Sequence, residues 1–153
     1  METDKKISAE RVQALREATG AGVMDCRKAL TEAAGDLEAA KKIIREKGLS
    51  KAEKRADRET GAGLVRAYVH NDRIGVLVEL RAETDFVVRS EPFQKLAHEL
   101  AMQIAATDPA DADALLAQPY IKDESRIVKD LLSDVIAKTG ENITIGKFFR
   151  IAA

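Results

Sequence analysis

The chain has 153 residues and a formal net charge of −1, and 45% of its residues are apolar while 33% are charged. This composition is typical of an ordered protein with a buried core, and no apolar run approaches the ~20 residues that span a bilayer. Neither half has the basic excess of a nucleic-acid-binding protein, so the composition excludes a transmembrane protein and disfavours direct DNA or RNA binding.

The N-terminal residues 1–6 lack the apolar stretch of a secretory signal, and they contain acidic side chains that organelle transit peptides avoid. The chain has one cysteine, which cannot form an internal disulfide. A single thiol is consistent with a reducing compartment. These features predict a cytoplasmic protein.

Residues 7–48 are predicted to form a bundle of three short helices. Ser8 is a suitable N-cap for the first helix, in which Val12, Leu15 and Ala18 are expected to form the buried stripe. Residues 1–48 therefore form the first predicted domain.

Glycines separate these helices. Gly20 and Gly22 predict a tight turn after the first helix, and Gly35 ends the second. Asp36 is a suitable N-cap for the third helix, and Gly48 is expected to end it. The apolar residues at near-helical spacing are Met24, Cys26, Ala29, Leu30 and Ala33 in the second helix and Leu37, Ala40, Ile43 and Ile44 in the third.

Residues 49–62 are predicted to be a charged linker between this bundle and a core domain of residues 63–153. Basic and acidic side chains alternate along it, and Leu49 is its only large apolar side chain. Because its alanines and charged residues are good helix formers, the linker is expected to be a semi-rigid helical spacer.

The core domain begins with a predicted antiparallel hairpin. Residues 64–70 and 74–81 are rich in Val, Leu and Ile, and the short polar turn 71–73 connects them. Ile143, Ile145, Phe149 and Ile151 alternate as a final strand, which is expected to pair with the hairpin.

Helical segments lie between the hairpin and the final strand. Ser90 and Pro92 mark the start of a helix that ends near residues 108–109, and residues 111–118 form a short connection. A further helix is predicted over residues 125–139, ending at Gly140. The expected fold class is therefore α+β, with a three-stranded antiparallel sheet covered by helices on one face.

Four short motifs occur in an order that resembles the elongation factor Ts family. They are residues 19–30 (Thr-Gly-Ala-Gly-Val-Met-Asp-Cys-Arg-Lys-Ala-Leu), residues 73–80 (Arg-Ile-Gly-Val-Leu-Val-Glu-Leu), residues 84–87 (Thr-Asp-Phe-Val) and residues 140–143 (Gly-Glu-Asn-Ile). Four motifs in sequence are more specific than any one of them. The resemblance implies a ubiquitin-associated-type N-terminal bundle and nucleotide-exchange activity on elongation factor Tu during bacterial translation.

An exchange factor makes and breaks no covalent bond, so the resemblance calls for no catalytic residue, cofactor or metal, and the protein is not expected to be an enzyme. It requires tighter binding to the nucleotide-free partner than to the nucleotide-bound one.

The segment that contains Phe86 has two interpretations. An aromatic side chain beside a carboxylate at a loop tip is typical of a binding site, but Phe86 could also fold into the core while Asp85 satisfies turn amides. The resemblance favours binding. It implies that Thr84, Asp85, Phe86 and Val87 enter the partner's G domain beside its magnesium site, where Phe86 wedges between two partner helices.

The resemblance also implies a docking surface on the N-terminal bundle. Val23 and Met24 match an apolar pair that packs on a helix of the partner, with Arg16 and Arg27 as ionic contacts. The alternative is that the apolar pair belongs to the bundle core and that the arginines are solvated. His70, beside the hairpin turn, matches another place where the family touches its partner.

Three further hypotheses remain open at this point. The N-terminal bundle could bind a helical partner without any exchange activity. Cys26 lies beside Arg27 and Lys28, so its thiol could have a lowered pKa and support a thiol-dependent enzyme, although a buried, inert cysteine is favoured.

The third hypothesis concerns oligomeric state. Family members often carry a longer helical segment and a second core half, and a single core half is expected to form a homodimer that covers its exposed surface.

Overall fold

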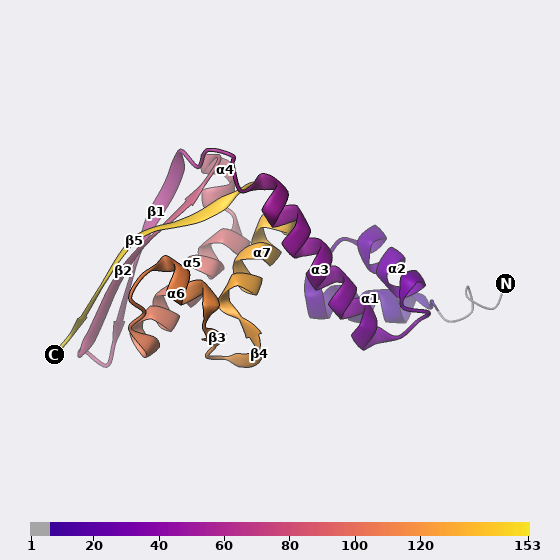
Figure 1. The fold of residues 1–153 in the computed structure, drawn as a ribbon, viewed down its shortest axis with the longest axis horizontal. Helices are drawn as coiled ribbons and strands as arrows, with labels where there is room; N and C mark the ends of the chain where they lie inside the picture. Colours follow the sequence, from indigo (N-terminus) through magenta and orange to yellow (C-terminus); the bar gives the residue numbers. More distant parts are fainter. Residues whose placement is uncertain (1–6) are drawn as a thin grey trace. The chain divides into compact units, whose positions relative to one another are not determined.

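A computed structural model describes residues 7–153, so the expectation that rests on residues 1–6 lies outside the described residues. The chain forms two compact units (Figure 1). The first extends to Lys51, and the second spans Ala52–Ala153. In the part of the chain that the structure describes, no helix is long and apolar enough to cross a membrane.

The first unit is helical, as predicted. It contains α1 (Ala9–Thr19), α2 (Val23–Glu32) and the first part of α3 (Leu37–Arg55). The two predicted caps are confirmed, because Ser8 Oγ accepts a hydrogen bond from Arg11 N at 3.3 Å and Asp36 Oδ1 accepts one from Ala39 N at 2.8 Å. The fully buried residues of this unit are Leu15, Cys26, Ala29, Leu30 and Ala40.

Two predictions for the helices of the first unit are wrong. Ala18 is exposed, because the buried stripe of α1 continues from Val12 and Leu15 to Thr19, one helical turn beyond Leu15. Gly48 does not end the third helix but lies buried within α3, which continues to Arg55. A glycine inside a helix costs about 1 kcal/mol, and the helix-forming residues that follow it outweigh this cost.

The second unit contains a three-stranded antiparallel sheet, which confirms the predicted strands. Its strands are β1 (Ala62–His70), β2 (Ile74–Ala82) and β5 (Ile143–Ala152), in the order β1-β2-β5. The hairpin turn has positive φ values of 50° at Asn71 and 58° at Asp72. These values are typical of a type I′ turn, whose twist matches that of the strands.

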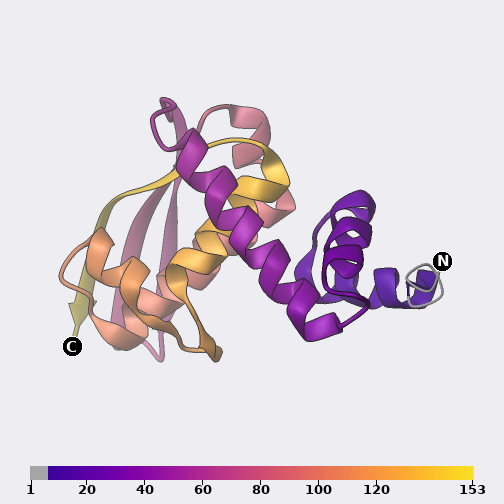
Figure 2. The same ribbon diagram turned by 45° about the vertical axis from the view of Figure 1, so that its right-hand side comes forward.

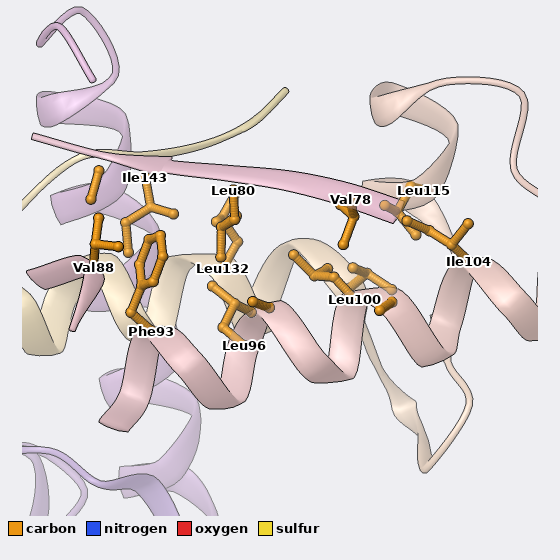
Figure 3. Close-up of a cluster of buried hydrophobic side chains, with 14 of the residues drawn as sticks. Val78, Leu80, Val88, Phe93, Leu96, Leu100, Ile104, Leu115, Leu132 and Ile143 are labelled. Carbon is orange, nitrogen blue, oxygen red and sulfur yellow. The ribbon is translucent and has the colours of Figure 1, made fainter. Parts of the chain in front are cut away.

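Helices cover one face of this sheet in both views (Figure 1 and Figure 2). They are α4 (Asp85–Val88), α5 (Glu91–Thr107), α6 (Ala112–Ala117) and α7 (Val128–Thr139). Figure 3 shows the core between the helices and the sheet. The α+β class is therefore confirmed. The largest fully buried apolar side chains of this core are Phe93, Leu100 and Ile104 of α5, Val78 and Leu80 of β2, Leu115, Val128 and Ile143.

A small hairpin was not predicted. Strands β3 (Pro119–Tyr120) and β4 (Asp123–Ile127) pair antiparallel, so α7 begins at Val128 and not at residue 125. Gln103, which is buried in α5, stabilises this hairpin. Its amide donates to the Pro119 carbonyl at 3.1 Å and accepts from the Ile121 amide at 3.0 Å.

The expected alternation along the last strand is interrupted. The pairing of β2 with β5 shifts register between Val78 and Leu80. The Glu79 side chain occupies the space that a Cβ on Gly146 would need, so this position requires glycine unless Glu79 moves. Beyond the shift, Phe148 packs against the core, whereas Phe149 and Ile151 are 65% and 74% exposed on the opposite face.

Candidate functional site

The turn formed by α4 presents one large apolar side chain to solvent. Phe86 is 85% exposed, and Asp85 beside it is also exposed. In contrast, Val87 and Val88 are only 4% and 7% exposed and belong to the core. The interpretation in which Phe86 folds into the core is therefore wrong, because the two valines anchor the turn instead.

Hydrogen bonds satisfy both ends of α4. At the first end, Thr84 Oγ accepts from Val87 N at 3.4 Å, so the Thr84 hydroxyl caps the turn, a role that the core interpretation assigned to Asp85. At the other end, Ser90 Oγ donates to the Val87 carbonyl at 2.6 Å, and Gln94 Nε2 donates to the Val88 carbonyl at 2.7 Å. Asp85 and Phe86 are thus held at the tip of a hydrogen-bonded turn.

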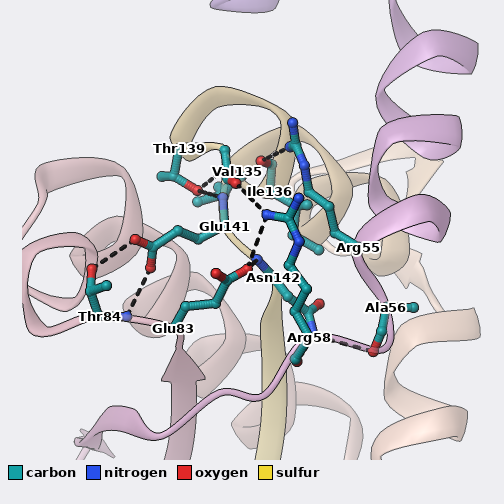
Figure 4. A network of polar contacts seen from close by, with 11 residues as sticks. Arg55, Ala56, Arg58, Glu83, Thr84, Val135, Ile136, Thr139, Glu141 and Asn142 are labelled. Atoms are coloured by element: carbon teal, nitrogen blue, oxygen red, sulfur yellow. Dashed lines mark hydrogen bonds and ion pairs between the residues drawn. The ribbon is translucent and has the colours of Figure 1, made fainter.

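A carboxylate from a distant part of the chain holds the start of the turn (Figure 4). Glu141 Oε1 accepts from Thr84 N at 2.9 Å, and Glu141 Oε2 accepts from Thr84 Oγ at 2.7 Å. The two residues are 57 positions apart in the sequence. Sequence reasoning used Glu141 only as part of a family motif and missed this contact.

Glu83 and Asn142, the sequence neighbours of Thr84 and Glu141, are also joined by a hydrogen bond. Glu83 Oε1 accepts from Asn142 N at 2.7 Å and forms an ion pair with Arg58 at 3.5 Å. Asn142 is 3% exposed, and its Nδ2 donates to the Ala56 carbonyl at 3.3 Å and the Arg58 carbonyl at 2.8 Å. The segment after α7 is therefore linked both to the end of β2 and to residues 56–58 (Figure 4).

The predicted docking residues lie at the surface of the first unit. Val23 and Met24 are 49% and 61% exposed at the start of α2, so neither is a core residue. Arg16 and Arg27 are exposed as well. The first unit thus presents an exposed apolar pair, and both arginines are accessible to solvent.

His70 lies at the end of β1 with both ring nitrogens in contact. Its Nδ1 is 2.9 Å from Tyr68 Oη, and its Nε2 is 3.2 Å from Asn71 Nδ2. The Tyr68 ring also meets His98 edge-on, with ring centroids 5.8 Å apart. These contacts orient an exposed imidazole beside the hairpin turn.

Cys26 lies in the core of the first unit. Its Sγ donates to the Ala21 carbonyl at 3.7 Å, and burial raises the pKa of the thiol. The hypothesis of a lowered pKa for this thiol is therefore wrong. A buried thiol with a raised pKa is a poor nucleophile, which also argues against a thiol-dependent enzyme. Among residues 7–153 there is also no group of three or more His, Cys, Asp and Glu side chains that could hold a metal ion.

Comparison with known proteins identifies close similarity along the chain. The family model described as "Elongation factor TS" matches residues 83–153. The chain is 43% identical over 190 aligned positions to elongation factor Ts of Oleidesulfovibrio alaskensis, covering 94% of this chain and 96% of that protein. It is 42% identical to elongation factor Ts of Moorella thermoacetica, covering 94% of each chain.

A longer plant protein is also similar. The chain is 38% identical to the chloroplastic polyprotein of EF-Ts from Oryza sativa subsp. indica, covering 97% of this chain and 18% of that protein. The alignment to the O. alaskensis protein has more positions than the 153 residues of the chain, so it must contain gaps opposite segments that this chain lacks.

Proposed function

The chain belongs to the elongation factor Ts family of translation elongation factors, and from this membership we propose that it promotes GDP release from elongation factor Tu. The single observation that supports this role most directly is Phe86, which is 85% exposed on a turn whose neighbours are fixed by hydrogen bonds. An exposed aromatic side chain held on an ordered turn is suited to insertion into a partner.

The proposed mechanism needs only a difference in affinity. Phe86 and Asp85 enter the G domain of elongation factor Tu beside its magnesium ion. Magnesium requires near-ideal octahedral geometry, so a small displacement of its surroundings weakens its binding and loosens the phosphates of GDP. By linkage, a protein that prefers the nucleotide-free partner must weaken nucleotide binding by the same factor.

The exposed residues of the first unit serve the same function by docking. Val23 and Met24 provide an apolar contact for a partner helix, and the flexible methionine side chain adapts to it. Arg16 and Arg27 add ionic contacts, and His70 of the second unit provides a further contact. The proposed site of action is the cytoplasm. The proposed exchange requires no cofactor and no covalent chemistry.

Stopped-flow fluorescence tests the proposed function. Elongation factor Tu is loaded with a fluorescent GDP and mixed with excess unlabelled GDP, with and without this protein. Substoichiometric protein should accelerate the release of label from all of the partner. An unchanged dissociation rate at saturating protein would show that the exchange function is wrong.

The alternative function is binding without exchange. The exposed Val23 and Met24 pair lies on a compact helical unit and would support it. Stable capture of elongation factor Tu, together with unchanged GDP release in the same preparation, would establish this alternative.

We also propose a homodimer through the uncovered face of the sheet. Five large apolar side chains from all three strands are 49–74% exposed there: Val65 and Val69 of β1, Leu77 of β2, and Phe149 and Ile151 of β5. Leu77 pairs with Phe149, and Gly75 of β2 pairs with both Val69 and Ile151, so these side chains lie near one another on the same face of the sheet. A second copy would bury the patch by packing sheet on sheet.

Sedimentation equilibrium tests the dimer. Native protein should approach twice its 16.7 kDa mass as concentration rises, and Phe149→Lys should shift the equilibrium to monomer. A native protein that remains monomeric at all concentrations would contradict the dimer.

A further inference from the structure

The exposed position of Phe86 requires an explanation outside the turn itself. Helix α4 has four residues, and a helix this short is not stable in isolation. A flexible turn would allow Phe86 to collapse onto nearby apolar surface and leave water. Contacts from other elements must therefore hold the turn in the arrangement that exposes Phe86.

Glu141 makes the contact that determines where the turn begins. Its two carboxylate oxygens accept from the amide and the hydroxyl of Thr84 at 2.9 and 2.7 Å. Hydrogen bonds to an ionised carboxylate are stronger than those between neutral groups. Two such bonds to one residue fix both the backbone and the side chain of Thr84.

The same contact orients the cap of the turn. The Thr84 hydroxyl has one proton, and donating it to Glu141 directs an oxygen lone pair toward the Val87 amide. The Val87 amide donates to that oxygen at 3.4 Å. Glu141 thus acts on Thr84 directly and on Val87 through the Thr84 hydroxyl, and these two residues flank Asp85 and Phe86.

The Glu141 side chain extends from a fixed piece of backbone. Gly140 ends α7 with a φ of 77°, a conformation that favours glycine, and its amide donates to the Ile136 carbonyl at 3.0 Å. The Glu141 amide donates to Thr139 Oγ at 3.4 Å, and the next residue, Asn142, is buried. The carboxylate is therefore presented to Thr84 from an ordered segment (Figure 4).

We infer that Glu141 is a positioning residue for nucleotide exchange, which holds the Phe86 turn in its inserting conformation before the partner arrives. This role rests on the proposed function. Its effect is preorganisation: binding does not have to order the turn, so less of the interaction free energy is lost when Phe86 inserts.

The test compares four variants. Glu141→Ala removes both acceptor oxygens. Glu141→Gln keeps two hydrogen bonds with one reversed, because its amide oxygen accepts from Thr84 N while its amide nitrogen donates to Thr84 Oγ, whose second lone pair still accepts from Val87 N. Thr84→Val removes the hydroxyl with little change in shape. Glu124→Ala is the matched control, since it deletes an exposed carboxylate in β4, away from the turn.

The first measurement uses the free protein. Amide hydrogen exchange followed by NMR should show that Glu141→Ala raises the exchange rates of Thr84 and Val87 by about tenfold or more, while buried α5 residues such as Leu100 keep their protection. Glu124→Ala should change none of these rates. Unchanged protection of Thr84 and Val87 in Glu141→Ala would overturn the inference.

The second measurement is GDP release from elongation factor Tu, expressed per folded molecule. Glu141→Ala should slow the maximal stimulated rate about tenfold, which corresponds to about 1.4 kcal/mol. Glu141→Gln should lie within about twofold of the native rate. A glutamine variant as slow as the alanine variant would show that the hydrogen-bond geometry is not the cause.

The double variant Glu141→Ala/Thr84→Val gives a further check. If the two residues act through one contact, the double variant should be about as slow as the slower single variant. Multiplied effects would show that they act independently and would overturn the inference.

Phe86→Ala, measured beside these variants, separates this inference from the proposed function. Normal exchange by Phe86→Ala would show that Phe86 itself has no role in exchange, which contradicts the proposed mechanism. Slow exchange by Phe86→Ala together with normal exchange by Glu141→Ala would contradict only the positioning role of Glu141 and would leave the proposed function standing.

Discussion

Phe86 and Phe93 lie on the adjacent helices α4 and α5, but their environments are opposite. Phe86 is 85% exposed, whereas Phe93 is fully buried between α5 and the sheet (Figure 3). Phe93 is part of a helical stripe with Leu96, Leu100 and Ile104, and Phe86 belongs to no such stripe. Periodicity therefore separates an aromatic residue that stabilises the fold from one that is available to a partner.

The largest expected effect is on stability, at Phe93. Phe93→Ala removes a fully buried ring, so the free energy of unfolding should fall by about 3–5 kcal/mol in a urea titration. Exchange activity per folded molecule should stay close to native. A loss below about 1 kcal/mol would contradict the assignment of Phe93 to the core.

Phe86→Ala should have the reverse pattern. The insertion of a phenylalanine is worth roughly 1.5–3 kcal/mol, so stimulated GDP release should slow by about one to two decades in stopped flow. The urea midpoint should barely change, because the side chain is already exposed. If Phe86→Ala unfolds at a much lower urea concentration and exchanges nucleotide normally, Phe86 stabilises the fold as Phe93 does and the proposed insertion is wrong.

Met24→Asp tests whether docking is separate from insertion. A charge in the apolar pair should weaken binding of elongation factor Tu about tenfold or more, measured by titration calorimetry, while the maximal exchange rate changes little. Met24→Leu serves as the apolar control and should bind normally. A folded Met24→Asp protein that binds normally, or that loses only the maximal rate, would contradict the docking role.

Asp85→Ala should produce a smaller defect than Phe86→Ala, in the same direction. The carboxylate is exposed, and its proposed role is to perturb the magnesium surroundings of the partner. We expect stimulated GDP release to slow by a few-fold, which corresponds to about 1 kcal/mol or less. A defect as large as that of Phe86→Ala would mean that Asp85 also carries part of the insertion.

The smallest expected effect is on the stability of the fold at acid pH, and it concerns Glu99 on α5, the helix that contains Phe93. Burial of Glu99 on α5 opposes ionisation, but hydrogen bonds from Tyr120 at 2.6 Å and Lys122 at 2.9 Å outweigh it and lower the pKa of the carboxyl. The unfolded chain therefore binds the proton first as the pH falls. The contribution of Glu99 to stability is present at neutral pH and lost as the pH falls through the lowered folded-state pKa, below the ordinary value of 4.5.

Urea titrations of native protein and Glu99→Gln between pH 7 and pH 3 measure this contribution. The difference in unfolding free energy between the two proteins should shrink toward acid pH. A difference that is independent of pH would show that the contacts of the ionised Glu99 carboxylate with Tyr120 and Lys122 do not stabilise the fold.

Local sequence patterns predicted much of the fold. Caps at Ser8 and Asp36 and the polar turn at residues 71–73 were read from residue types alone, because these preferences act over a few residues. Patterns failed where two signals competed. Gly48 is a typical helix end, but the residues after it favour a helix, so α3 continues through it.

The candidate site was predictable in part. The contrast between exposed Phe86 and buried Val87 could not be read from the tetrapeptide Thr-Asp-Phe-Val, because both of its apolar side chains suit either environment there. The direction of each side chain depends on how the turn sits on β1, β2 and α5, and that is a property of the packed unit.

The sequence by itself determined the N-terminal helices, the three strands of the main sheet, the α+β class and the family, because periodicity, caps and turn residues act locally and the motifs are contiguous. Only the tertiary structure decided that Glu141 holds Thr84 and that Phe149 and Ile151 face solvent. Both outcomes depend on contacts between segments far apart in the chain. A long-range hydrogen bond and a shift in strand register leave no local pattern, because they form only when the whole unit packs.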